Sequence, residues 1–186
     1  MITLPTPKDR RFIFNKQVTQ ESIGTLSKDI LDVNSDDAYI SDLYALHGFT
    51  YSPMPIEVFI DSYGGSVYNG FGILSIIENS KTPVHTIVTG CAMSCGFLIS
   101  ISGHKRYAYK TSTFLYHQAS SGTYGKLKEM DDDVIEVKRL QKIIEEYTLS
   151  HTKIDRKKLK EVYDMKQDWF ISAKEALSLG IIDEIL

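Results

Sequence analysis

Three side chains, Ser94, His117 and Asp168, are of the types that nucleophilic catalysis by a serine requires. Ser94 lies in the run 89–100, which reads TGCAMSCGFLIS, between a β-rich segment at 84–88 and apolar residues that can form a buried helix. A serine at such a strand-to-helix turn presents its hydroxyl away from the backbone, and the first N–H groups of the helix have no intrahelical partners. These N–H groups can stabilise the negative oxygen of a tetrahedral intermediate. Small residues also occur where a helix simply packs tightly on a sheet, so this run alone does not identify Ser94 as a nucleophile. That assignment also requires a general base.

The base must come from five histidines, and His117 is the best placed because it ends a predicted strand. Active sites of α/β proteins lie at strand ends. His85 lies inside a predicted strand and is expected to be a core or face residue. We expect His47, His104 and His151, which lie in irregular or terminal segments, to be exposed to solvent.

An acid that orients His117 completes the set, and Asp168 is the favoured candidate. It precedes the apolar pair Trp169-Phe170, which predicts that it is partly buried. Asp164 lies one helical turn earlier and is the alternative. The chain order of serine, histidine and aspartate differs from the orders in chymotrypsin, subtilisin and the α/β-hydrolases.

The elements that must position these residues alternate between strands and helices. Alternation of apolar and polar residues predicts strands, and apolar spacing of three to four predicts helices. The strands are expected at 11–14, 56–60, 84–88, 105–109, 113–116 and 181–186, and the helices at 20–33, 67–79, 126–148, 156–164 and 173–179. Such alternation predicts an α/β fold with right-handed crossovers. We expect one domain over 1–186, with a flexible segment at 1–10 and an extended connection at 34–55.

Composition limits the classes of function. The 186 residues carry a formal net charge of −3, which offers no electrostatic reason to expect a nucleic-acid partner. No apolar run can span a bilayer and no secretion signal is evident, so we expect no membrane partner and a cytoplasmic location. Cys91 and Cys95 are expected to be small buried thiols, and the acidic run Asp131–Asp133 a solvated helix face, so neither predicts a metal site.

A set of short motifs then occurs in a fixed order along the chain. The motifs are RFIF at 11–14, IDSYGGSV at 60–67, GCAMSCG at 90–96, YHQ at 116–118, GTYG at 122–125, DWFISAKEA at 168–176 and GIID at 180–183. In this order and spacing, the sequence resembles the ClpP-like peptidases, the proteolytic subunits of the Clp protease family.

The resemblance implies a fold and a set of roles. The fold is the ClpP/crotonase-like repeated β-β-α superhelix, with the helix at 126–148 as a protruding handle. Ser94 would be the nucleophile, His117 the general base and Asp168 the residue that orients His117. The backbone N–H groups of Gly65 and Cys95 would form the oxyanion hole, and Gly64, Gly122 and Gly125 would contact substrate. No cofactor is implied.

The resemblance also implies an assembly. Family members hydrolyse unfolded polypeptides inside two stacked seven-subunit rings, a tetradecamer that a hexameric AAA+ unfoldase feeds. The sequence contains no phosphate-binding Gly-x-x-x-x-Gly-Lys loop, so any use of ATP belongs to a partner. Four residues depart from the family pattern: Tyr63 and Ala119 replace prolines, and Lys166-Gln167 replaces an acidic-Arg pair that joins the rings.

Three other functions remain open at this point. The departures suit a divergent, phage-encoded protease with a dedicated task, such as trimming a capsid scaffold without an unfoldase. A non-catalytic ring subunit is a second reading, although such relatives usually lose triad residues. An acyl-CoA enzyme on the related crotonase fold is a third, although that fold normally has a longer chain and carboxylate acid–base residues.

Overall fold

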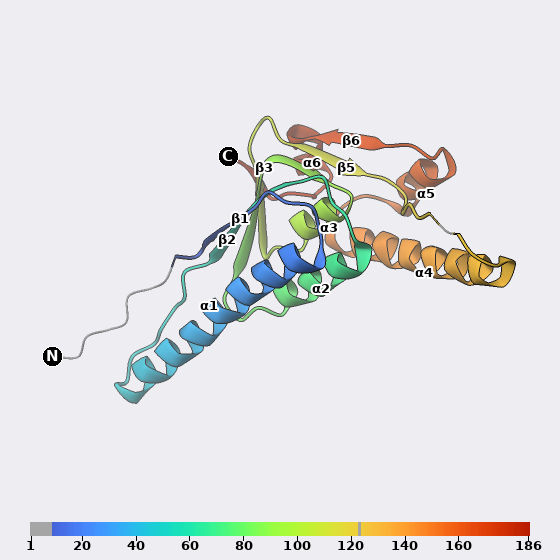
Figure 1. The fold of residues 1–186 in the computed structure, drawn as a ribbon. Coiled ribbons are helices and arrows are strands. Elements are labelled where there is room, and N and C mark those ends of the chain that lie inside the picture. Colours follow the sequence, from blue (N-terminus) through green and yellow to red (C-terminus); the bar gives the residue numbers. More distant parts are fainter. Residues whose placement is uncertain (1–8, 123) are drawn as a thin grey trace.

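The fold is known from a computed structural model, which describes residues 9–122 and 124–186 (Figure 1). Strands and helices alternate along most of the chain. In chain order they are β1 (Arg11–Phe14), α1 (Gln20–Leu46), β2 (Ile56–Ser62), α2 (Val67–Glu78), β3 (Val84–Met93), α3 (Cys95–Ile101), β4 (Lys105–Ala108), β5 (Thr113–Tyr116), α4 (Leu127–His151), α5 (Arg156–Asp164), β6 (Trp169–Ser172), α6 (Ala173–Ser178) and β7 (Glu184–Ile185).

The strands form one mostly parallel sheet, and β3 is its central strand. The order β1-β2-β3-β4-β7 is parallel throughout. The first half of β3 pairs with β4, whereas Cys91–Met93 at its end pair with β5, which also pairs antiparallel with β6. The predicted α/β class is therefore confirmed.

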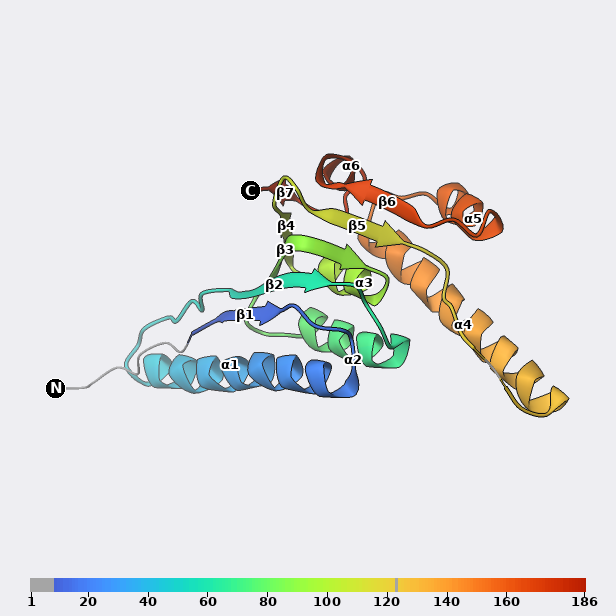
Figure 2. The ribbon, with the colours of Figure 1, turned by 45° about the horizontal axis from the view of Figure 1, so that its top comes forward.

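The helices pack on this sheet except for one long projection. Helices α1, α2 and α3 lie side by side, and α3 contacts β3 (Figure 2). The core between these layers is built from fully buried side chains, among them Ile60, Ile73, Ile77, Phe97 and Phe114. Helix α4 begins far from the sheet, and its C-terminal half packs against α3, as Figures 1 and 2 both show. This is the protruding helix expected at 126–148, and it runs three residues further, to His151. Among the described helices, none is long and apolar enough to cross a bilayer.

The expected extended connection at 34–55 is wrong over most of its length, because α1 continues to Leu46. The run Asn34-Ser35-Asp36-Asp37 predicts a helix end, since these side chains compete with the helix for backbone hydrogen bonds. In the structure Asn34 instead binds the Ile30 carbonyl and Ser80. Only residues 47–55 connect α1 to β2 without regular structure.

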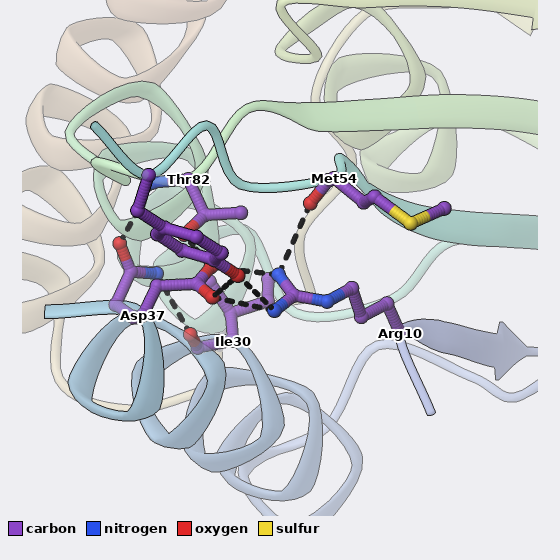
Figure 3. A network of polar contacts seen from close by, with 7 residues as sticks. Arg10, Ile30, Asp37, Met54 and Thr82 are labelled. Atoms are coloured by element: carbon purple, nitrogen blue, oxygen red, sulfur yellow. Dashed lines mark hydrogen bonds and ion pairs between the residues drawn. The ribbon is translucent and has the colours of Figure 1, made fainter. Parts of the chain in front are cut away.

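Asp37 lies at the centre of a buried polar network (Figure 3). The Arg10 guanidinium donates to both Asp37 carboxylate oxygens, at 2.5 and 2.6 Å, and to the Met54 carbonyl at 3.0 Å. Tyr51 and Thr82 also donate to the carboxylate, at 2.7 and 2.5 Å. Burial alone raises the pKa of Asp37, but these hydrogen bonds outweigh it and hold the pKa below its ordinary value. The network joins α1, the connection at 47–55 and the loop before β3 to the N-terminal segment.

The network also bears on the last residue of the flexible segment expected at 1–10. Arg10 is 8% exposed and paired with Asp37, so the expected flexibility is wrong at this residue. Residues 1–8 lie outside the described part of the chain.

Three smaller expectations also need correction. The last strand is Glu184–Ile185 and not 181–186, because Ile181 and Ile182 are buried in the core and the Asp183 carboxylate binds Arg106. His151 is not simply solvated: its ring stacks on Tyr147, and its Nε2 atom lies 2.8 Å from the Glu78 carboxylate. Strand β6, Trp169–Ser172, is missing from the sequence-based assignment altogether.

Candidate active site

Ser94 lies where β3 ends and α3 begins. Its backbone angles are φ 53° and ψ −121°, which a residue with a Cβ rarely adopts. Such strain is concentrated at functional sites, where the surrounding structure holds it in place. Here the Ser94 N–H donates to the Leu115 carbonyl at 3.0 Å, and the Ser94 carbonyl accepts from the first turn of α3. The turn is therefore fixed on both sides by β5 and α3.

The glycine turn after β2 packs directly against Ser94. The parallel register pairs Ser62 with Ala92, so the residues that follow the two strands meet at the same edge. The Ser62 hydroxyl donates to the Lys16 carbonyl and accepts from the Gly64 N–H, which fixes the turn. A Cβ on Gly64 would lie 2.6 Å from the Met93 carbonyl oxygen and 2.8 Å from the Ser94 Cβ, and Gly64 has φ +92°. Only glycine fits there.

Gly64→Ala is therefore expected to destabilise the protein by about 1–3 kcal/mol or more, the cost of a strained backbone residue. It is also expected to displace the Ser94 turn, because the clashing atoms are backbone or Cβ atoms that cannot rotate away. Urea unfolding would measure the loss of stability, and the rate at which a fluorophosphonate modifies Ser94 would measure the displacement of the turn.

Gly72→Ala is the matched control. Gly72 lies in helix α2, and a Cβ there meets nothing within 4 Å. This substitution is expected to raise stability by about 0.5–1 kcal/mol. A Gly64→Ala protein as stable as the Gly72→Ala protein would contradict the packing described for the turn.

His117 and Asp168 are brought together by β5 and β6. The antiparallel register pairs Tyr116 with Trp169, so the residue after β5 lies opposite the residue before β6. His117 Nδ1 lies 3.6 Å from Asp168 Oδ1, slightly longer than a hydrogen bond. The His117 side chain is 27% exposed and that of Asp168 is 63% exposed, so Asp168 is less buried than its apolar neighbours predict. Asp164, the alternative acid, forms an ion pair with Lys160.

Ser94 and His117 share two adjoining hollows. The smaller is a cavity of ≈ 50 Å³, lined by Gly65, Val67, Ser94, Cys95, Phe97, Leu98, Tyr116, His117, Gln118, Ala119, Ser120 and Ile144. The other is an open groove of ≈ 590 Å³, which Tyr63, Gly64, Gly65, Ser94 and His117 line with others. In the described residues no hydrogen bond joins Ser94 to His117. Such contacts are often long in free enzymes and tighten when substrate binds.

The predicted oxyanion donors, Gly65 and Cys95, lie on the two turns that flank Ser94. Neither N–H group donates a hydrogen bond within residues 9–122 and 124–186. The Cys95 thiol donates to the Gly65 carbonyl at 3.3 Å and so ties the two turns together. Both Cys91 and Cys95 are buried and free, as expected, and burial raises the pKa of each thiol to about 11. Cys95 therefore has a structural role: its side chain packs in the core, and its thiol connects the two turns.

Two of the predicted substrate residues lie elsewhere. Gly122 and Gly125 line neither hollow, and Gly125 lies beside Glu129 at the start of α4. Their neighbour Thr123 is outside the described residues. Gly64, by contrast, lines the groove with Ser94. No cluster of three potential metal-ligating side chains was found in the part of the chain that the structure describes.

Two residues of the site were not predicted from sequence. Tyr116 forms a wall of the small cavity, and Gln141 of α4 accepts a hydrogen bond from the Ala119 N–H at 2.7 Å. Tyr116 belongs to the YHQ motif and ends a predicted strand, but no role at the site was predicted for it. Gln141 lies within the apolar stripe of the helix, four residues after Val137 and three before Ile144, so the available signal was a polar residue at a position expected to be buried.

Comparisons with known proteins agree with this architecture. The family model of the Clp protease matches residues 8–186. The ATP-dependent Clp protease proteolytic subunit of Deinococcus radiodurans is 35% identical over 133 residues, which cover 70% of this chain and 64% of that protein. Proteolytic subunit 2 of Bacillus licheniformis is 29% identical over 181 residues, covering 96% of this chain and 87% of that protein. Proteolytic subunit 2 of Treponema pallidum is 27% identical over 179 residues, or 95% and 85%. The chain therefore belongs to the Clp protease family of serine endopeptidases, as its motifs predicted.

Proposed function

We propose that this protein is a serine endopeptidase subunit in which Ser94, His117 and Asp168 form the catalytic triad. One observation carries the proposal: the registers of β3, β5 and β6 bring the ends of three strands together. The strained serine turn, the histidine and the aspartate lie at those ends. Among the described residues, His117 is the only histidine that lines either of these two hollows beside Ser94.

The chemistry follows from this arrangement. His117 Nε2 removes the Ser94 hydroxyl proton as Oγ attacks the carbonyl carbon of the scissile peptide bond. Asp168 faces His117 Nδ1 and stabilises the imidazolium that forms. The carbonyl oxygen, now negative, accepts from the Gly65 and Cys95 N–H groups. The C–N bond then breaks, and His117 returns the proton to the leaving amine. Water, activated by His117, finally hydrolyses the acyl-enzyme and regenerates Ser94.

An extended polypeptide is the substrate that the groove suits. The groove runs past Tyr63, Gly64 and Gly65, where the absence of side chains on the two glycines leaves the backbone accessible to a substrate strand. A folded protein cannot present such a strand. Unfolded chains, or exposed segments, are therefore the proposed substrates.

The proposal extends to the assembly. The relatives are named as proteolytic subunits of ATP-dependent proteases. We infer a homo-oligomer of two stacked seven-subunit rings, with the sites inside. An AAA+ unfoldase would bind and hydrolyse the ATP, because this chain has no phosphate-binding loop of its own.

Covalent labelling with a fluorophosphonate, followed by intact mass measurement, tests the triad. One adduct per chain is expected on the wild type and none on Ser94→Ala. Ser120→Ala is the matched control, because Ser120 lines both hollows, and it is expected to keep the adduct. If the assembled wild type takes no adduct, the catalytic assignment is wrong and a non-catalytic ring subunit takes its place.

A second candidate is a processing protease that works without an unfoldase. Two features favour this candidate. Helix α1 is long, and Lys166-Gln167 replaces the acidic-Arg pair expected at the contact between rings. Degradation of a folded substrate that depends on an added unfoldase and ATP would contradict this candidate. Cleavage of a single partner protein without ATP would support it.

A further inference from the structure

The main chain around His117 is held at two points. Before it, the Leu115 carbonyl accepts from the Ser94 N–H, and β5 ends at Tyr116. After it, the Ala119 N–H donates to Gln141 Oε1 at 2.7 Å. Gln141 lies on α4, so this bond connects the histidine segment to the projecting helix.

The Gln141 side chain is itself fixed. It is 7% exposed, and its Nε2 atom donates to Glu145 Oε1 at 2.9 Å. The bond to Glu145, one turn further along α4, determines which end of the amide is the oxygen and directs that oxygen at Ala119. Both the oxygen and the nitrogen of the Gln141 amide are therefore hydrogen-bonded, which fixes the orientation of the side chain.

The segment that Gln141 holds is a wall between two hollows. Residues 118–120 line the small cavity with Ser94 and His117 on one side. On the other side they line a groove of ≈ 420 Å³ with α4 and Tyr163. Gln141 lines this second groove, so its side chain supports the wall from behind.

We propose that Gln141 is a positioning residue, which places the His117 imidazole toward Ser94 by anchoring the chain at Ala119. The inference rests on the proposed function. It follows from the geometry of the free protein: the 3.6 Å separation of His117 from Asp168 is longer than a hydrogen bond, so a second anchor on the same segment contributes to the position of the ring. The orientation of His117 therefore depends on where α4 lies, because Gln141 is part of that helix.

Gln141→Met is the test variant, because methionine has a similar length and no acceptor for the Ala119 N–H. Loss of the acceptor leaves a partly buried donor unpaired. We expect the second-order rate of Ser94 labelling and kcat for a short peptide to fall about tenfold, with KM changed less than about twofold. A small displacement of reacting groups suffices for such a loss.

Two further variants separate positioning from general damage. Gln141→Glu combined with Glu145→Gln keeps an acceptor for Ala119 and a donor between the two side chains, and is expected to restore both rates to within about twofold. Lys142→Met makes the same kind of change at the next, exposed position of α4 and is expected to have no effect.

Hydrogen exchange of the Ala119 amide tests the bond without relying on activity. Protection is expected in the wild type, loss of protection in Gln141→Met, and recovery in the double variant. Unchanged exchange in Gln141→Met would overturn the inference. So would wild-type labelling by Gln141→Met, or an effect confined to KM. If Ser94 is not labelled in the wild type, the proposed function fails, and the exchange experiment still decides whether Gln141 holds Ala119.

Discussion

Replacing His117 by alanine is expected to lower kcat for peptide hydrolysis by about 10⁴–10⁶-fold, because the base and the nucleophile of a triad act as a unit. Ser94→Ala is expected to cost about as much. The loss should appear in kcat and not in KM, because His117 acts on the reacting atoms and contributes little to the binding of a long substrate. Steady-state kinetics with a fluorogenic peptide on the assembled protein would measure it.

Asp168→Asn is expected to cost less, about 10²–10⁴-fold, because its side chain is 63% exposed and 3.6 Å from His117. His47→Ala is the control, since His47 is exposed and lies beyond the end of α1, and its activity should be that of the wild type. Equal losses for His117→Ala and His47→Ala would point to damage of the fold. An active His117→Ala protein would remove His117 from the mechanism.

Replacing Asp37 by asparagine is expected to destabilise the protein by about 3–5 kcal/mol, the usual result of removing one partner of a buried ion pair. Asparagine keeps the shape but leaves the buried Arg10 guanidinium without an opposite charge (Figure 3). Urea unfolding would measure the loss. Lys28→Met is the control: it breaks the exposed Lys28–Asp32 pair on the same helix and should leave the midpoint unchanged.

The same carboxylate predicts how stability depends on pH. The pKa of Asp37 is lower in the folded protein than in the unfolded chain, where it is about 3.9. Its contribution is therefore fully present above that value and is lost as the pH falls through the folded pKa. The wild type should lose stability below about pH 4 more steeply than Asp37→Asn does. Parallel acid-unfolding curves would contradict the role of the network.

Local signals in the sequence were sufficient for most of the elements and for the candidate residues. Alternating β-branched residues mark β2 and the first half of β3, and the Ser172–Glu175 capping box marks the start of α6, where the structure has it. The serine turn, the histidine at a strand end and the glycine turn were each visible as motifs. These features depend on residues close together in the chain, so composition and spacing can reveal them.

The errors occur where distant residues decide the outcome. Helix α1 passes through Asn34 and Asp37, which favour a helix end, because Ser80 and Arg10 satisfy their side chains. Strand β6 is short, and only its antiparallel pairing with β5 makes it a strand. Gln141 is a polar residue within the apolar stripe of α4, and only the fold shows that the Ala119 N–H is its partner.

By itself, then, the sequence determined the α/β class, the family and the side chains able to do the chemistry, because local patterns and short motifs carry that information. Only the tertiary structure decided which of those side chains meet. The β5–β6 register places Asp168 rather than Asp164 opposite His117, and the β3–β5 register places Ser94 beside the end of β5, which His117 follows. A register is a choice among long-range pairings, which the packing of the whole core makes and no single segment can specify.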